Sequence, residues 1–142
     1  MNILIIFLFL IASTLSQSNI TLSDLQWKNR VLLVFPSDHK AKEMDFSLTE
    51  DLEVNLKDRY LIYFYFGDSL ISNSAHSFDS DYQKKLKQRY QMGSKEHSYV
   101  LIGKDGSSKM KKEGDSIDWQ ALFETIDAMP MRIREIKMNP DK

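Results

Sequence analysis

The sequence has 142 residues, of which 42% are apolar and 11% aromatic, so it is long and apolar enough for one domain with a substantial core. Its formal net charge of -1 gives no general electrostatic reason to expect nucleic acid or an anionic membrane as a partner. The sequence contains no cysteine, which excludes disulfides, thiolate metal sites and all cysteine-based catalysis.

Residues 1–18 are predicted to be a signal peptide, and residues 19–142 a single domain. An unbroken apolar run from Ile3 to Ala12 has the length of a signal-peptide core and is short for a transmembrane helix. Small polar residues follow, and we expect cleavage after Ser16 or Ser18. The protein is therefore expected to be exported, either periplasmic or secreted, with no membrane contact beyond the signal peptide. An uncleaved membrane anchor is the alternative.

The first half of the domain predicts a strand, a helix and a second strand. The apolar runs 31–35 and 60–66 are typical of strands that are buried on both faces. Between them, Leu48, Leu52 and Leu56 recur at helical spacing, which predicts a helix over 44–57. A strand–helix–strand unit places its two strands parallel to each other.

The middle of the chain predicts a loop and a helix. Residues 67–79 are rich in Ser, Asp and Asn, which indicates an irregular and mobile connection. Residues 81–92 return to helical spacing, and Gly93 is placed to end that helix. The basic side chains on this helix are expected to be a solvated face rather than a nucleic-acid surface; they are Lys84, Lys85, Lys87 and Arg89.

The last third predicts a hairpin and a helix. Residues 97–102 indicate a strand, Asp105-Gly106 is a turn signal, and residues 107–112 fit an edge strand protected by lysines. Ser116 is a plausible N-cap for the final helix. Pro130 either ends that helix at Met129 or begins a new one at Met131.

The predicted order of elements is β-α-β-α-β-β-α. This order is typical of the thioredoxin fold, in which a central sheet combines two parallel strands with two antiparallel ones. The predicted fold class is therefore α/β and thioredoxin-like, with a central mixed sheet. Trp27 and Trp119 are both expected to lie in the core.

Three segments carry a resemblance to a known family. They are the run from Trp27 to Phe35, the run from Leu101 to Gly106, and the run from Ile126 to Arg132 with Glu135. Together they resemble an exported domain-of-unknown-function family with a thioredoxin- or peroxiredoxin-like fold. They are also similar to a domain of animal sushi-repeat-containing and coiled-coil-domain extracellular proteins. The resemblance covers residues 22–137, and it implies fold and export rather than a reaction.

Within that resemblance, the loop from Ser37 to Lys40 stands where thioredoxins carry their redox cysteine pair. Without thiols this loop cannot carry out disulfide exchange or peroxide reduction. Residues 94–97 also lack the cis-proline that thioredoxins carry before the third strand. Both departures from the pattern argue against a redox enzyme.

Two candidate sites remain. Ser37, Asp38 and His39 are the residue types of nucleophilic catalysis, although adjacent residues rarely point at one another and a polar turn is the favoured interpretation. The three histidines have no metal-ligand spacing, and no metal or cofactor is predicted.

The second site is a charged cluster at the end of the chain, formed by Arg132, Arg134 and Glu135 with Lys104 and Asp105 of the hairpin turn. Its guanidinium groups suit a carboxylate or phosphate. The favoured alternative is an internal salt bridge between Arg132 and Glu135, with Asp127 nearby, that fastens the last helix. Lys104 and Asp105 are likewise more typical of a well-formed turn than of a site.

The sequence therefore predicts an exported, non-catalytic module that binds a protein or a small anionic ligand and does not bind nucleic acid. The alternative is an enzyme, either a hydrolase or a thiol-independent redox enzyme, that uses the loop from Ser37 to Lys40.

Overall fold

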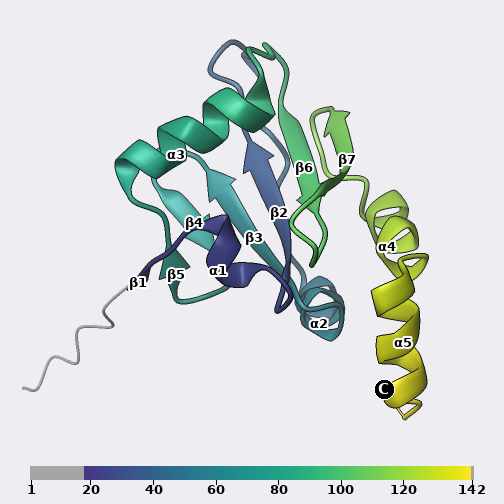
Figure 1. The fold of residues 1–142 in the computed structure, drawn as a ribbon. Helices are drawn as coiled ribbons and strands as arrows, with labels where there is room; N and C mark the ends of the chain where they lie inside the picture. The colour runs from purple at the N-terminus through teal and green to yellow at the C-terminus, as the bar shows by residue number, and fades with distance from the viewer. Residues whose placement is uncertain (1–17, 142) are drawn as a thin grey trace, which may run out of the picture.

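The computed structural model describes residues 18–141 (Figure 1), so the predicted signal peptide lies outside the described residues except for Ser18. The structure is mixed α/β and is built on a five-stranded mixed sheet with the strand order β4-β3-β2-β6-β7. A second, small sheet pairs β1 (Ser18–Asn19) with β5 (His76–Ser77) in parallel.

The centre of the main sheet is β2 (Arg30–Phe35) beside β3 (Leu61–Phe66), and the two are parallel as predicted. On the other side of β2 lies β6 (Ser98–Ile102), which is antiparallel to it. The predicted lysine-rich edge strand is β7 (Ser108–Glu113), antiparallel to β6. Gly106, in the turn between them, has a φ of 82°, which is the left-handed conformation that the Asp-Gly signal predicts.

The helices of residues 18–141 mostly follow the predicted order. They are α1 (Leu22–Leu25), α2 (Glu50–Asp58), α3 (Ser80–Leu86) with the π-helical turn η1 (Lys87–Gln91), α4 (Trp119–Asp127) and α5 (Pro130–Met138). Pro130 begins a new helix, which is one of the two outcomes predicted, because proline has no N–H to leave unsatisfied at a helix start.

Helices cover both faces of the sheet, and β2 contributes to both core layers (Figure 1). Val31, Leu33 and Phe35 pack in a layer with residues of α3 and η1. Leu32 and Val34 pack in the opposite layer with residues of α2 and α4. The alternation follows from the two-residue period of a strand, and it explains why this strand is apolar at every position from 31 to 35.

The prediction of a helix over 44–57 was wrong at its start. Helix α2 begins at Glu50, where the Thr49 hydroxyl accepts a hydrogen bond from the Leu52 N–H. Met44, Phe46 and Leu48 pack against the core from an extended segment instead. The Asp45 N–H donates to the Asp115 carbonyl, 2.7 Å away, so a long-range backbone bond holds this segment out of the helix.

Two further predictions need correction. The stretch 67–79 is not wholly irregular, because it contains β5 and also β4 (Leu70–Ser72), which pairs with β3. Ser116 does not cap the last helix. The Asp118 carboxylate does so by accepting from the Ala121 N–H, while Ser116 lies in a β-bridge with Asp45.

Candidate functional site

Glu135 of α5 lies at the centre of an ion-pair network that fastens this helix to the sheet. Its two carboxylate oxygens accept from Nη1 and Nη2 of Arg30, at 3.1 and 3.2 Å, and Lys104 Nζ lies 2.6 Å from Oε1. The Arg30 side chain is 1% exposed and that of Glu135 16%. Burial by itself would raise the pKa of Glu135, but the hydrogen bonds from Arg30 and Lys104 outweigh it and lower the pKa.

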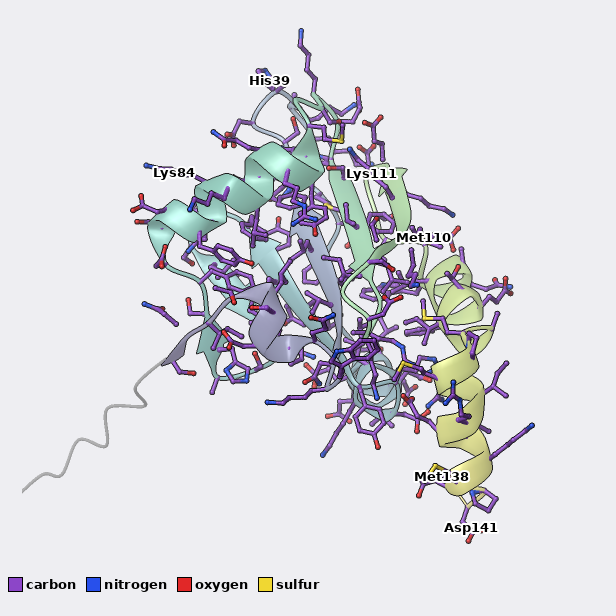
Figure 2. The ribbon with its side chains drawn as sticks, viewed as in Figure 1. His39, Lys84, Met110, Lys111, Met138 and Asp141 are labelled. Atoms are coloured by element: carbon purple, nitrogen blue, oxygen red, sulfur yellow. The ribbon has the colours of Figure 1, made fainter. Side chains whose placement is uncertain are left out.

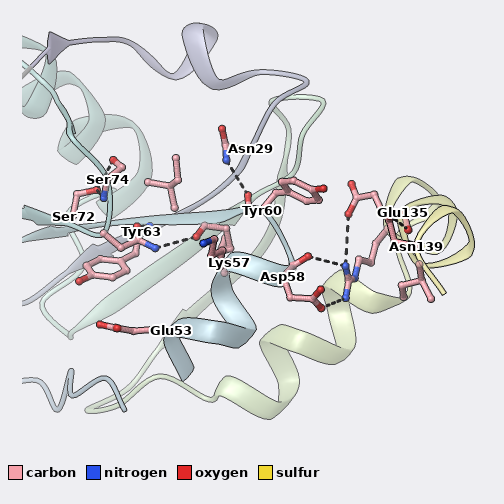
Figure 3. A pocket seen from close by; sticks show the side chains of 15 residues that line it. Asn29, Glu53, Lys57, Asp58, Tyr60, Tyr63, Ser72, Ser74, Glu135 and Asn139 are labelled. Carbon is pink, nitrogen blue, oxygen red and sulfur yellow. Dashed lines mark hydrogen bonds and ion pairs between the residues drawn. The ribbon is translucent and has the colours of Figure 1, made fainter. Parts of the chain in front are cut away.

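Arg132 forms the second half of this network. Its Nε donates to Asp127 Oδ1 at 3.1 Å. Its Nη1 donates to the Asp58 carbonyl at 2.9 Å and its Nη2 to Asp58 Oδ2 at 2.6 Å, and Figure 3 marks these two bonds at Asp58. Arg132 Nη1 also lies 3.8 Å from Glu135, so the predicted pair is confirmed, as is the nearby position of Asp127. Every guanidinium nitrogen of Arg132 therefore faces a protein acceptor.

Arg59, the C-cap of α2, completes the network. It donates from Nε and Nη2 to the two Asp127 oxygens, at 3.0 and 2.9 Å, and its guanidinium lies 4.3 Å from the centroid of the Phe123 ring. Burial alone would raise the pKa of Asp127, and the bonds from Arg59 and Arg132 lower it overall. The network thus links the ends of α2 and α4 to α5 and to the start of β2.

A groove of about 760 Å³ opens beside the network (Figure 3). Its walls come from α2, the start of β3, the turn after β4, and α5. Glu53 and Lys57 of α2 line it and form no ion pair within residues 18–141. Tyr60 also lines it and is 41% exposed. The groove therefore offers free polar groups and an aromatic ring beside a wall that the ion pairs hold rigid.

The outer edge of β3 forms one side of this groove, and Asn73 covers it. The Asn73 Oδ1 accepts from the Tyr63 N–H at 3.0 Å, and its Nδ2 donates to the Leu61 carbonyl at 3.2 Å. The side-chain amide thus takes the place of a neighbouring strand where β4 has ended. This protects the edge from pairing with another strand.

The structure brings together only part of the predicted C-terminal cluster. Arg132, Glu135 and Lys104 belong to the network. Asp105 serves the hairpin turn instead, and the bond from Lys109, followed by those from Ser107, lowers its pKa to about 2. Arg134 is exposed and has no ion pair in the described part of the chain.

The loop from Ser37 to Lys40 does not assemble a catalytic triad. The Ser37 hydroxyl donates to the Lys95 carbonyl at 2.6 Å. His39 is exposed at the tip of the loop (Figure 2), and its ring has no hydrogen-bond partner among residues 18–141. A cavity of about 710 Å³ lies beside the loop and is lined by Ser37 and Asp38, but not by His39.

His97 is the histidine that holds this loop in place. Its Nδ1 accepts from the Ser37 N–H at 2.9 Å, and its Nε2 donates to the Lys42 carbonyl at 2.6 Å. A backbone N–H can only donate and a carbonyl can only accept, so these bonds select the tautomer with the proton on Nε2. His97 is 2% exposed, and its ring is part of the scaffold of the loop.

Three features were missed or misjudged from the sequence. Trp27 was expected in the core, but it is 62% exposed and has a φ of 67°. Arg30 was expected only to precede a strand, but it is fully buried as the first residue of β2. Asn73 was assigned to a loop and caps a strand edge. The sequence signal for the burial of Arg30 is its position directly before the apolar run 31–35, with polar residues on its other side.

The remaining predictions concern the basic face of α3 and η1, metal binding and Trp119. Lys84, Lys85, Lys87 and Arg89 are all exposed, as predicted, and Figure 2 shows Lys84 on the outside of α3. Within residues 18–141, no three His, Asp or Glu side chains are placed to share a metal ion. Trp119 packs against the core layer of α2 and α4.

Comparison with known protein families matches residues 21–135 to a family described as a domain of unknown function (DUF4174). The comparison with curated proteins found no match. The matched segment contains every residue of the ion-pair network and ends at Glu135.

Proposed function

The chain belongs to the DUF4174 family, and from this premise we propose that it is an exported, thioredoxin-like module that binds a protein or a small anionic ligand without chemical change. We also propose that the chain is similar to a domain of animal sushi-repeat-containing and coiled-coil-domain extracellular proteins. Binding without catalysis needs a preformed surface with free polar groups, and it needs no nucleophile or base.

The order of the strands supports the thioredoxin-like assignment. The four strands β3-β2-β6-β7 combine one parallel pair with antiparallel neighbours. Helices follow β2 and β7 directly, and α3 follows β3 after the short strands β4 and β5. Strand β4 extends the sheet beside β3, while α1 and the small β1–β5 sheet precede or flank this core. A thioredoxin-like assignment would put the loop after β2 where thioredoxins carry their redox motif.

The chemistry of that loop supports a function without thiols. The sequence has no cysteine, and the Ser37 hydroxyl at this position is occupied by a backbone carbonyl. A nucleophile needs a base within hydrogen-bond reach, and the ring of His39 is solvated. No observation favours the alternative of an enzyme that uses this loop.

The groove beside the network is the observation that carries the proposal. Its volume is in the range of small-molecule and side-chain pockets. The buried pairs of Arg132 and Glu135 hold its wall in one geometry, so little order has to be gained on binding. Arg134 lies on the same helix and is free to meet an anionic group.

Substitution of Arg134 tests the binding function without disturbing the network. We expect Arg134→Ala to weaken retention of a partner or anion about two- to fivefold, because an exposed ion pair contributes about 0.5–1 kcal/mol. Partners are captured on the immobilised protein from culture medium or periplasm, identified by mass spectrometry and titrated. Arg89→Ala, an exposed arginine on η1, is the matched control and should bind as the unmodified protein does. Failure of the unmodified protein to retain any partner or anion would contradict the proposal.

Export has its own test. Within residues 18–141, every helix is too short or too polar to span a bilayer, so the apolar run from Ile3 to Ala12 is the segment that would direct the chain to a membrane. We expect the product recovered from the medium or periplasm to begin at Gln17 or Asn19, as read by N-terminal sequencing and intact mass. A membrane-bound product that keeps Met1 would favour the anchor instead.

A further inference from the structure

Large apolar side chains are exposed on three elements that meet at Lys104 and Glu135. Five of them lie on the segments that lead into β2 and β3 and on α5, namely Trp27 (62% exposed), Tyr60 (41%), Ile133 (41%), Ile136 (45%) and Met138 (80%). The other exposed large apolar residues of the described chain are on three different elements, Val54, Ile71 and Met92. We call the first group the Trp27–α5 surface.

Lys104 joins the parts of this surface. Its carbonyl accepts from the Trp27 N–H at 2.6 Å, its Nζ lies 4.2 Å from the centroid of the Tyr60 ring, and the same Nζ lies 2.6 Å from Glu135 of α5. Tyr60, labelled in Figure 3, and Ile136 line the same groove. Tyr60 and α5 are therefore held on either side of the groove, and the backbone of Trp27 is tied to both through Lys104.

Both aromatic residues have an unusual backbone. Trp27 has a φ of 67° and Tyr60 a φ of 51°, and bulky side chains rarely adopt this left-handed conformation. Each residue directly follows the C-cap of a helix, α1 for Trp27 and α2 for Tyr60, where a left-handed residue, usually glycine, commonly ends the helix. In Trp27 the strain is not offset by burial of the ring, which faces solvent. Trp and Tyr are also the residues most enriched among the energetic centres of protein interfaces.

Unpaired cations surround this surface. Lys28, Lys57, Arg134 and Lys137 are exposed and form no ion pair within residues 18–141. The unpaired acids in the same region are Asp24, which lies close to Lys28, together with Glu53 and Asp141, so the four cations exceed the acids by one although the whole chain carries -1. Complementary charge at the rim of an interface selects its partner and speeds association.

We propose that the Trp27–α5 surface binds a segment of another protein that presents apolar side chains flanked by carboxylates. This inference rests on the proposed binding function and names its surface and partner chemistry. An anionic membrane shares the same charge and apolarity, but a bilayer meets a convex surface, whereas here a groove lies between Tyr60 and Ile136 and can take a side chain. A peptide segment is therefore the favoured occupant.

The test uses fluorescent synthetic peptides in which leucines are flanked by glutamates, and matched peptides with lysines in place of the glutamates. Fluorescence anisotropy with the full chain should show that the acidic peptides bind about tenfold or more tightly than the basic ones. Trp27→Ala and Ile136→Glu should each weaken the acidic peptides about tenfold or more. Val54→Glu, an exposed aliphatic residue on α2, is the matched control and should leave binding unchanged. Thermal unfolding confirms that each variant is folded.

Several outcomes would overturn the inference. One is equal binding of acidic and basic peptides, and another is an equal loss with Val54→Glu. Binding only to vesicles of phosphatidylserine and phosphatidylcholine would assign the surface to a membrane, and self-association lost in Trp27→Ala would assign it to a second copy. If a captured partner binds Trp27→Ala and Ile136→Glu as tightly as the unmodified protein, the binding function stands and this surface is excluded. If nothing binds at all, both proposals fail.

Discussion

Replacing Glu135 with alanine is expected to lower the free energy of unfolding by about 3–5 kcal/mol, because it removes one partner of a buried ion pair and leaves the other charge uncompensated. Arg30 would keep its guanidinium in a site where the side chain is 1% exposed, with the Arg59 carbonyl as a remaining acceptor. Arg30 Nε already lacks a hydrogen-bond acceptor in this site, so no further acceptor is in place to replace the Glu135 carboxylate. Chemical denaturation followed by circular dichroism measures the change.

Two comparison variants separate the loss of the pair from the loss of a glutamate. Glu124→Ala, at an exposed position of α4, should change the stability by no more than about 0.5 kcal/mol. The double variant Arg30→Met with Glu135→Leu should lose less than Glu135→Ala alone, because it leaves no buried guanidinium unpaired. A double variant that is less stable than the single one would show that the charges themselves, and not their pairing, stabilise the fold.

The same pair should make the stability depend on pH. The pKa of Glu135 in the folded protein lies below its unfolded value of 4.5. A lowered pKa means that the unfolded chain binds the proton more readily, so the stabilisation is present above pH 4.5 and is lost as the pH falls through the folded pKa. The difference in stability between the unmodified protein and Glu135→Ala should therefore shrink as the pH falls below about 4.5. A difference that stays constant would contradict the ion pair.

Strands β2, β3, β6 and β7 could be predicted from the sequence because each has a strong local signal, whereas the short strands β4 and β5 were missed. The apolar runs of β2 and β3 and the Asp-Gly turn need no knowledge of distant residues. The pair of Arg132 and Glu135 could also be predicted, since residues three apart lie side by side on a helix. The prediction of a helix from residue 44 failed because the Asp45 N–H binds the Asp115 carbonyl. That partner is distant in the sequence, so local spacing gives no sign of it.

Arg30 and Trp27 show the limits of local reasoning more clearly. A charged residue before an apolar run usually marks the end of burial, and Arg30 is buried only because Glu135 meets it from 105 residues away. A tryptophan is usually counted toward the core, and Trp27 is exposed because its left-handed backbone lies at the entry to β2, with its N–H bonded to Lys104. In both cases a contact to the hairpin turn or to α5 decided the outcome.

Replacing His97 with alanine is expected to lower the free energy of unfolding by about 1.5–4.5 kcal/mol, because one buried N–H loses its partner at about 1–3 kcal/mol and one partly buried carbonyl loses a hydrogen bond of about 0.5–1.5 kcal/mol. These groups are the Ser37 N–H and the Lys42 carbonyl, which the imidazole bridges from 60 and 55 residues away. The Ser37 hydroxyl also ties the loop to the Lys95 carbonyl, and Lys40 pairs with Glu96 at the surface. Denaturation measures the stability, and hydrogen exchange measures the loop.

His39→Ala is the matched control, because His39 lies in the same loop but is exposed at its tip (Figure 2). It should change the stability by no more than about 0.5 kcal/mol. In His97→Ala the amides of residues 37–42 should exchange faster than in the unmodified protein, because the loop can then open locally without unfolding the sheet. If exchange in this loop is unchanged, the imidazole does not hold it. The loop from Ser37 to Lys40 would then be ordered by its backbone and by the Ser37 hydroxyl alone.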